Sequence, residues 1–237
     1  MFTARGGKRS TPAKSAGKKL LITLLTVYVV ACMFFFFGMM FVQLCSPLVE
    51  SGMDTVYFVL VAIMTFLFMF IGSVFITQKQ LYEATDNELL LSMPIPPVYI
   101  VISRMTAILL VNLMYGAFTV IPAFVVYSMA TGFSIAVMLI MLIASLLLSV
   151  LALCLSAVCG WLLALLLSNL KRKKIFSTVF MLAFFFAIMG FYMNLQKILN
   201  KLVIEGAALA DAMRKVFPPF YFYGKAVAET DMVSLIL

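Results

Sequence analysis

The chain has 237 residues, of which 65% are apolar and 11% are charged. A soluble domain carries about a quarter charged residues, so this composition excludes an ordinary water-soluble globular protein. The formal net charge of +8 does not indicate nucleic-acid binding, because most of the basic residues flank apolar runs. Six of the seventeen precede the first run, and four form the block 171–174. Basic residues in these positions are typical of the cytoplasmic face of a membrane protein, so we expect membrane lipid as a partner and no nucleic acid.

Residues 1–19 predict a disordered basic arm in the cytoplasm, and residues 20–237 predict one transmembrane domain. A run of about 20 apolar residues is long enough to cross a hydrocarbon layer as a helix. The predicted fold class is therefore all-α: a polytopic transmembrane helical bundle with about five complete spans, the start of a sixth, and a cytoplasmic N-terminus. The predicted spans are 20–44, 55–77, 99–128, 133–170 and 175–193.

The charges on the connections favour this topology. The loop 45–54 contains acidic residues but no basic residue, which favours the outer side, whereas Lys79 follows the second span. In the third span, Asn112 is expected near mid-depth. Arg104 is expected close enough to the inner surface for its guanidinium to reach it.

The run 133–170 is longer than one span and shorter than two, so it predicts either one long helix or a span followed by a surface segment. The basic block after it favours the cytoplasm, which requires the run to cross the membrane once. Small residues recur at every fourth position, and such a face lets helices pack closely in lipid. These residues are Ala152, Ser156, Gly160, Ala164 and Ser168.

The last third of the chain alternates between apolar and polar character. Residues 195–215 have the period of an amphipathic helix, which we expect to lie at the outer face. The aromatic residues around Pro218 and Pro219 predict an anchor at the membrane interface. They are Phe217, Phe220, Tyr221, Phe222 and Tyr223. A new apolar run begins at 232 and is too short to cross a membrane, which predicts a fragment of a longer protein or a truncated gene.

Residues 81–97 form the most polar internal segment. Thr85 and Glu88 have the spacing of a capping box, and Asp86 adds negative charge at the start of the helix. Pro94 ends this helix, since the residue before a proline is displaced from helical geometry. We expect a short, rigid helix over 82–93 at the cytoplasmic surface between the second and third spans. The alternative is a surface helix, ended by proline, that has no partner.

The string Asp86-x-Glu88-Leu89-Leu90-Leu91-Ser92-Met93-Pro94-Ile95 resembles the first cytoplasmic loop of bacterial ABC-2-type transporter permeases, especially the two-half permeases of Gram-positive bacteria. Met93 stands where that family has leucine. The resemblance implies a coupling helix that binds a separate ATP-binding-cassette ATPase. It also implies a second permease half or a homodimer partner as a further subunit, and a location in the bacterial cell membrane. The implied coupling residues are Tyr82, Glu83, Asp86, Glu88, Leu89, Leu90, Leu91, Met93 and Pro94.

Several other functions fit the residues less well. The sequence has no glycine-rich loop ending in Gly-Lys-Ser or Gly-Lys-Thr, so ATP hydrolysis would belong to another subunit. The four cysteines lack metal-ligand spacing and there is no histidine, so we expect no metal, no cofactor and no enzyme. The predicted spans contain no acidic residue, which disfavours an ion-coupled carrier. A membrane scaffold or assembly protein is the main alternative to an exporter permease, and the residues do not identify a substrate.

Overall fold

The computed structural model describes residues 12–82, 96–168 and 218–230, together with positions 182, 186, 189, 190, 193 and 194. Within these residues every regular element is a helix. The elements are α1 (Pro12–Glu50), α2 (Asp54–Thr77), the π-helical turn η1 (Gln78–Tyr82), α4 (Pro97–Thr131), α5 (Ile135–Ser168) and α7 (Pro218–Ala228).

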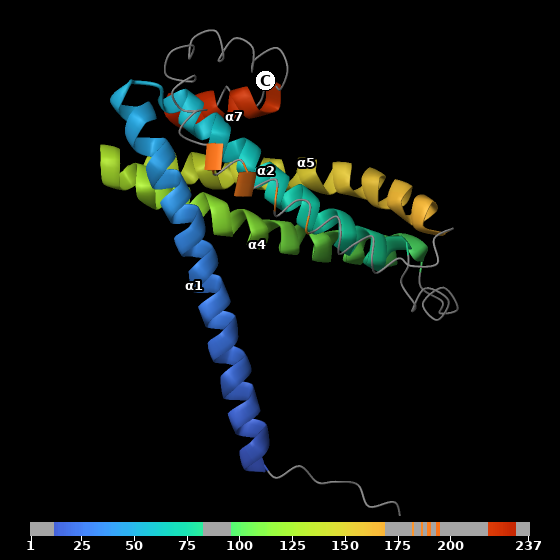
Figure 1. The fold of residues 1–237 in the computed structure, drawn as a ribbon. Helices are drawn as coiled ribbons and strands as arrows, with labels where there is room; N and C mark the ends of the chain where they lie inside the picture. The colour runs from blue at the N-terminus through green and yellow to red at the C-terminus, as the bar shows by residue number, and fades with distance from the viewer. Residues whose placement is uncertain are drawn as a thin grey trace, which may run out of the picture.

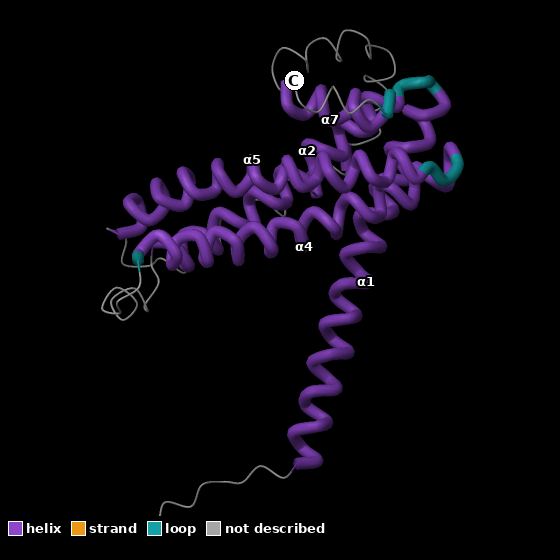
Figure 2. The backbone as a smooth tube through the Cα atoms, turned by 180° about the vertical axis from the view of Figure 1, so that it is seen from behind, coloured by secondary structure: helices purple, strands orange, loops and turns teal. Residues whose placement is uncertain are grey.

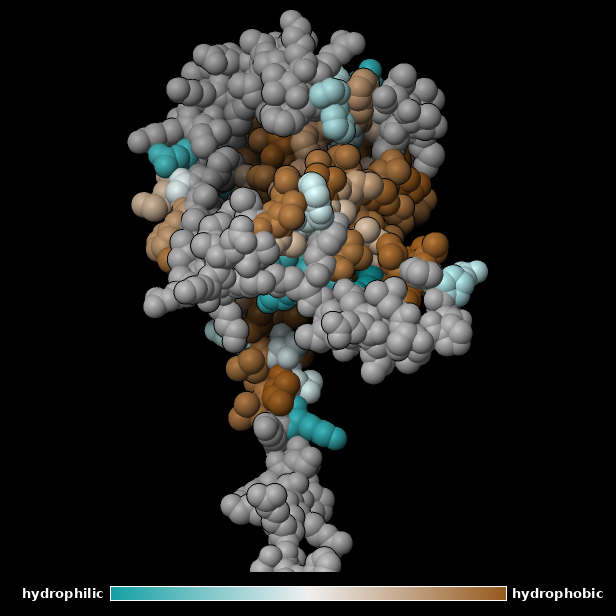
Figure 3. All heavy atoms as spheres, turned by 90° about the vertical axis from the view of Figure 1, so that its right-hand side faces the viewer, coloured by the Kyte–Doolittle hydropathy of each residue, from teal (hydrophilic) through white to brown (hydrophobic). Residues whose placement is uncertain are grey.

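Four of the described helices are long and apolar enough to cross a membrane. The crossing segments are Lys19–Glu50, Asp54–Leu81, Val98–Thr131 and Ile135–Leu162. The surface of the described residues is largely apolar, as Figure 3 shows for one side of the molecule. Exposed apolar side chains are expected where the surrounding solvent is lipid. The fold is a polytopic helical membrane bundle, which confirms the predicted fold class.

Helices α2, α4 and α5 lie side by side and form the centre of the bundle (Figure 1). Helix α1 crosses them near one end, and its N-terminal half leaves the bundle (Figure 2). Aromatic rings fix the crossing, since Phe37 packs edge-on against Phe68 with ring centroids 5.3 Å apart. By contrast, the side chains of residues 20–29 are exposed.

Helix α1 extends beyond the predicted span 20–44 at both ends. It begins at Pro12, inside the arm that the sequence predicts to be disordered, because proline suits the first helical turn and the alanines and lysines after it favour helix. It ends at Glu50, beyond Pro47. The N–H groups of Gly52 and Met53 donate to the last carbonyls, each at 2.9 Å, and the φ of +68° at Gly52 completes this Schellman-type cap.

Helix α5 decides between the two predictions for 133–170. It is one helix of 34 residues, about 51 Å long at 1.5 Å per residue. No proline interrupts it, and leucine and alanine, both strong helix formers, dominate its sequence. Within the described part of this run, the span-plus-surface-segment alternative is therefore excluded.

Helix α7 packs against the first half of α2. Phe220 and Tyr223 are buried and Tyr221 and Phe222 are half-buried, so the described part of the Pro-Pro-aromatic stretch packs on protein, while its anchoring at the lipid interface stays a prediction. The close approach depends on a glycine in α7. A Cβ added at Gly224 would meet the side chain of Val59 and the carbonyl oxygen of Thr55. Sequence periodicity alone does not reveal that α2 covers this face.

Other predictions lie wholly or mostly outside the described residues. They are residues 1–11 of the basic arm, residues 83–93 of the coupling helix, most of the span 175–193, the amphipathic helix 195–215, the aromatic Phe217 and the apolar run from 232. The described positions of 175–193 are helical. The rest of these assignments stay predictions.

Candidate functional site

The predicted coupling segment lies between two described flanks. Of its nine implied residues only Tyr82 is described, and it is the last residue of η1. The other eight lie outside the described residues. They are Glu83, Asp86, Glu88, Leu89, Leu90, Leu91, Met93 and Pro94.

The first flank continues directly from α2. The α-helix ends at Thr77 and passes into the π-helical turn η1 without a break in the chain's helical path. A π-turn widens the helix by one residue and often occurs at functional positions. The second flank begins with Pro96 at the N-cap and Pro97 in the first turn of α4, which starts that helix abruptly.

An arginine links the two flanks. The guanidinium of Arg104, on α4, donates a hydrogen bond of 2.7 Å to the backbone carbonyl of Gln80 in η1. The charged donor makes this bond stronger than one between neutral groups. The sequence predicted only that Arg104 reaches the inner surface, which stays a prediction, and the structure adds that Arg104 joins α4 to η1. This hydrogen bond connects the two helices that flank the coupling segment.

The small-residue face of α5 lies against this region. Ala152, Ser156 and Gly160 are buried and Ala164 is half-buried. A Cβ added at Gly160 would lie 3.2 Å from the Thr77 methyl and 3.3 Å from the backbone nitrogen of Gln78. The lack of a side chain at 160 therefore lets α5 contact the junction between α2 and η1 at backbone distance.

A set of buried polar side chains runs along the interfaces of α2, α4 and α5, and we name it the polar seam. It consists of Thr65, Ser73, Thr77, Gln78, Asn112, Thr119, Ser145, Ser149 and Ser156. The described residues contain no buried charged side chain. The seam therefore brings hydrogen-bonding groups, without formal charge, into the centre of an otherwise apolar bundle.

Most hydroxyl groups of the polar seam have hydrogen-bond partners. The hydroxyl of Thr119 lies 2.9 Å from that of Thr65, and the hydroxyl of Thr77 lies 3.4 Å from that of Ser156. The remaining serines each donate to a carbonyl of their own helix three residues earlier. Such bonds satisfy the hydroxyl proton and leave acceptor capacity on the oxygen.

Asn112 is the member of the polar seam whose buried side-chain atoms lack a hydrogen-bond partner. Its side chain is 0% exposed, and neither its amide nitrogen nor its amide oxygen has a hydrogen-bond partner among the described residues. Leaving a buried polar group unpaired costs about 1–3 kcal/mol. The sequence placed this residue at mid-depth but gave it no role. The available signal was a lone amide in a span without acidic residues, which alone does not show whether a neighbouring helix satisfies it.

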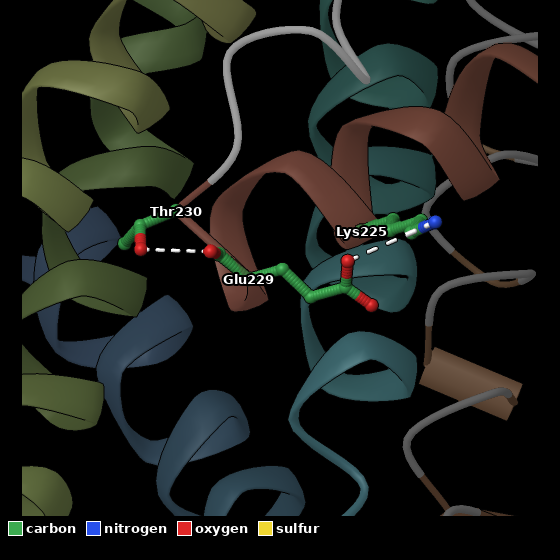
Figure 4. Close-up of polar contacts among 3 residues, drawn as sticks. All are labelled: Lys225, Glu229 and Thr230. Atoms are coloured by element: carbon green, nitrogen blue, oxygen red, sulfur yellow. Dashed lines mark hydrogen bonds and ion pairs between the residues drawn. The ribbon is translucent and has the colours of Figure 1, made fainter.

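The opposite end of the bundle contains a second group of polar atoms. One carboxylate oxygen of Asp54 and the hydroxyl of Tyr223 are buried, and neither has a hydrogen-bond partner within the described ranges. Beyond them, Lys225 and Glu229 on the surface of α7 form an ion pair with 3.7 Å between nitrogen and oxygen, and Thr230 donates to the Glu229 carbonyl at 2.8 Å (Figure 4). The described residues contain no cluster of three side chains suited to a metal ion.

One cavity lies between α5 and α7. Its volume is about 440 Å³, and its walls are mainly apolar. Leu147, Leu148 and Leu151 line it from α5, and Pro219 and Phe222 line it from α7. A cavity with mainly apolar walls can hold an apolar group such as a hydrocarbon chain.

Comparison with known proteins places the chain in one family. The model of a family described as membrane proteins of 12 TMs matches residues 19–237. No curated protein and no solved structure matches the chain. The matched range includes the four crossing segments, both flanks of the coupling segment and the polar seam.

Proposed function

The chain belongs to the family of membrane proteins with 12 transmembrane segments, and from that premise we propose that it is a permease subunit of an ATP-binding-cassette exporter. In this proposal the chain supplies a membrane pathway, and a separate ATPase subunit hydrolyses ATP. The observation that carries the proposal is the acidic, proline-ended segment 82–94 between two spans, in a sequence that resembles ABC-2-type permeases. Twelve spans in the family agree with the two-half arrangement of those permeases.

The flanks of the segment support a mechanical role. A coupling element must transmit displacement, so its ends must be attached stiffly to the spans that move. Here η1 continues α2, and Arg104 ties η1 to α4. A push on the segment would therefore reach two central helices together. Closure of two ATPase subunits would tilt the coupling segment together with α2 and α4. This tilt would change the side of the membrane to which the pathway opens.

The charge distribution supports an external energy source. Ion-coupled carriers bind their ions with ionisable groups inside the membrane. The buried polar side chains of the described bundle are all uncharged. The sequence also lacks a phosphate-binding loop of the Gly-Lys-Ser or Gly-Lys-Thr type. Energy supplied by a partner ATPase agrees with both properties. The bacterial cell membrane is the location that the resemblance implies.

The test is co-purification of ATP hydrolysis with the chain. The tagged protein is extracted from membranes of its native host, and ATP hydrolysis is measured in the eluate. We expect Glu88→Lys and Leu90→Asp each to reduce this activity at least tenfold, because they reverse the charge or disrupt the apolar face of the coupling helix. Membrane insertion, measured by the amount of extracted chain, should not change.

The matched control is Glu50→Lys. It makes the same charge change at an exposed position near the α1–α2 turn, which lies at the other end of α2 from η1. This variant should retain the ATP hydrolysis of the unmodified protein. Equal activity in all the variants would refute the proposal. A native eluate without ATP hydrolysis would also refute it and would favour a scaffold or assembly protein.

A further inference from the structure

We propose that Asn112 forms a binding position, within the polar seam, for one neutral group that both donates and accepts hydrogen bonds. The group is a water molecule or the hydroxyl or amide of a small uncharged solute. Such a position governs what the membrane interior admits, and it does not depend on an ATPase partner. Three properties support it: the place of the side chain, its missing partners, and the uncharged character of the described residues around it.

The register of the helices places Asn112 opposite the middle of the seam. Helices α2 and α4 run antiparallel, with Arg104 reaching Gln80 at one level and Thr119 meeting Thr65 at another. Interpolating between these contacts puts Asn112 level with Gly72, the residue next to Ser73 in the chain. The contact between Thr77 and Ser156 puts Ala152 of α5 at nearly the same level. Three helices therefore converge where the unpaired amide lies.

The side chains at this level leave the amide with little to bond to. The hydroxyl of Ser73 donates within its own helix to the carbonyl of Phe70, at 3.1 Å. Ala152 has no polar side-chain atom. Both ends of the Asn112 amide thus keep their full hydrogen-bonding capacity, which is two donors on nitrogen and an acceptor on oxygen. The group that satisfies both ends must itself donate and accept.

The surroundings select against ions. The side chains of the polar seam are hydroxyls and amides, and the described residues bury no charged side chain. Transferring an ion into such a medium without a counter-charge costs far more than one amide and a few hydroxyls return. A neutral molecule loses much less on leaving water. The seam is therefore selective for uncharged groups, and its hydroxyl oxygens offer further acceptors on either side of Asn112.

The test measures which reagents reach the level of Asn112. The four native cysteines are replaced by alanine, and Asn112→Cys and Ser73→Cys are each reconstituted into liposomes. The two proteins are treated with a neutral methanethiosulfonate that carries a hydroxyethyl group and with its anionic sulfonatoethyl counterpart. Ser51→Cys, in an exposed turn, is the accessible control. Met114→Cys is the lipid-facing control, because Met114 is 64% exposed on the same helix as Asn112.

We expect the neutral reagent to modify the Asn112→Cys protein at least tenfold faster than the Met114→Cys protein. The reason is that the reacting thiolate forms only where water or another polar group is present. The anionic reagent should modify the Asn112→Cys protein at least tenfold more slowly than it modifies the Ser51→Cys protein.

Acetamide at high concentration separates the two sources of the bound group. It is added to the Ser73→Cys protein, in which the Asn112 amide is intact. Slower labelling of this protein, with labelling of the Ser51→Cys protein unchanged, assigns the position to a neutral solute. Unchanged labelling of both proteins assigns it to water.

Two results would overturn the inference. One is labelling of the Asn112→Cys protein no faster than that of the Met114→Cys protein, and the other is equal labelling by the neutral and the anionic reagent. If the Asn112→Cys protein does not fold, both comparisons are made with the Ser73→Cys protein, which carries a nearly isosteric change next to that level.

A second variant tests the role of the amide itself. Asn112→Leu removes the amide and keeps a side chain of similar size. Combined with Ser73→Cys, it should abolish labelling of the introduced thiol by the neutral reagent. Retained labelling of that thiol in the double variant would count against a role for the amide.

Discussion

Gly224 shows how one residue determines the position of a whole helix. An added Cβ would collide with the Val59 side chain and would lie 2.7 Å from the Thr55 carbonyl oxygen and 2.9 Å from the Val59 backbone nitrogen. Backbone atoms of a packed helix cannot yield as a flexible side chain can. The contact between α7 and α2 therefore requires glycine for its lack of a side chain, since its φ is not in the left-handed region.

We expect Gly224→Ala to lower the free energy of unfolding by about 1–3 kcal/mol, the usual cost of overpacking. Better helix propensity would offset part of this cost. Thermal unfolding in detergent measures the change. Gly38→Ala is the matched control, because a Cβ there meets no atom within 4 Å, and it should be neutral or slightly stabilising. A Gly224→Ala protein as stable as the Gly38→Ala protein would mean that α7 does not pack on α2 as described.

At the scale of elements, the link between η1 and α4 controls the ends of the coupling segment. Arg104→Ala removes the hydrogen bond to the Gln80 carbonyl. We expect the segment to become more accessible, so that a glutamate-specific protease added to inside-out vesicles cleaves at Glu83 or Glu88 several-fold faster. Thr106→Ala is the control, because its hydroxyl donates to Ile102 of the same helix. Equal cleavage rates in the two variants would show that Arg104 does not restrain the segment.

Sequence periodicity is sufficient to find the long helices but not all of their ends. Apolar length predicted the core of each of the four described spans, since lipid requires about 20 apolar residues per crossing. The extension of α1 to Pro12 escaped prediction because charged residues in a helix carry no hydropathy signal. The extension past Pro47 escaped it because proline usually ends or kinks a helix. The burial of α7 depends on a partner helix distant in sequence, which a local pattern cannot indicate.

The candidate site was predictable to different degrees. The period of four in α5 indicated a packing face, and the structure places Ala152, Ser156 and Gly160 buried on that helix. The coupling segment rests on local capping signals and a family resemblance. The significance of Asn112 was not predictable, because whether its amide finds a hydrogen-bond partner depends on which side chains the neighbouring helices place beside it. The sequence of α4 alone shows only a polar residue in an apolar helix.

At the scale of the whole molecule, the described spans differ in how much of their surface the bundle covers. Helices α2, α4 and α5 cover one another, and α7 covers one end of α2. Only 6% of the most apolar window of α1 is buried, compared with 44% in α2 and in α5. Residues 20–29 of α1, most of them apolar, are exposed on every side, and such a surface is stable only in contact with lipid or with other membrane-embedded protein.

The side of the membrane that Glu88 faces decides whether an ATPase can reach the coupling segment. In a background without native cysteines, Glu88→Cys is labelled with a membrane-impermeant maleimide in intact cells and in inside-out vesicles. We predict labelling in the vesicles alone, with Ser51→Cys, in the α1–α2 turn, labelled in intact cells alone. Labelling of the Glu88→Cys protein in intact cells would place the segment outside the cell, where no ATPase can bind it, and would contradict the proposed exporter function.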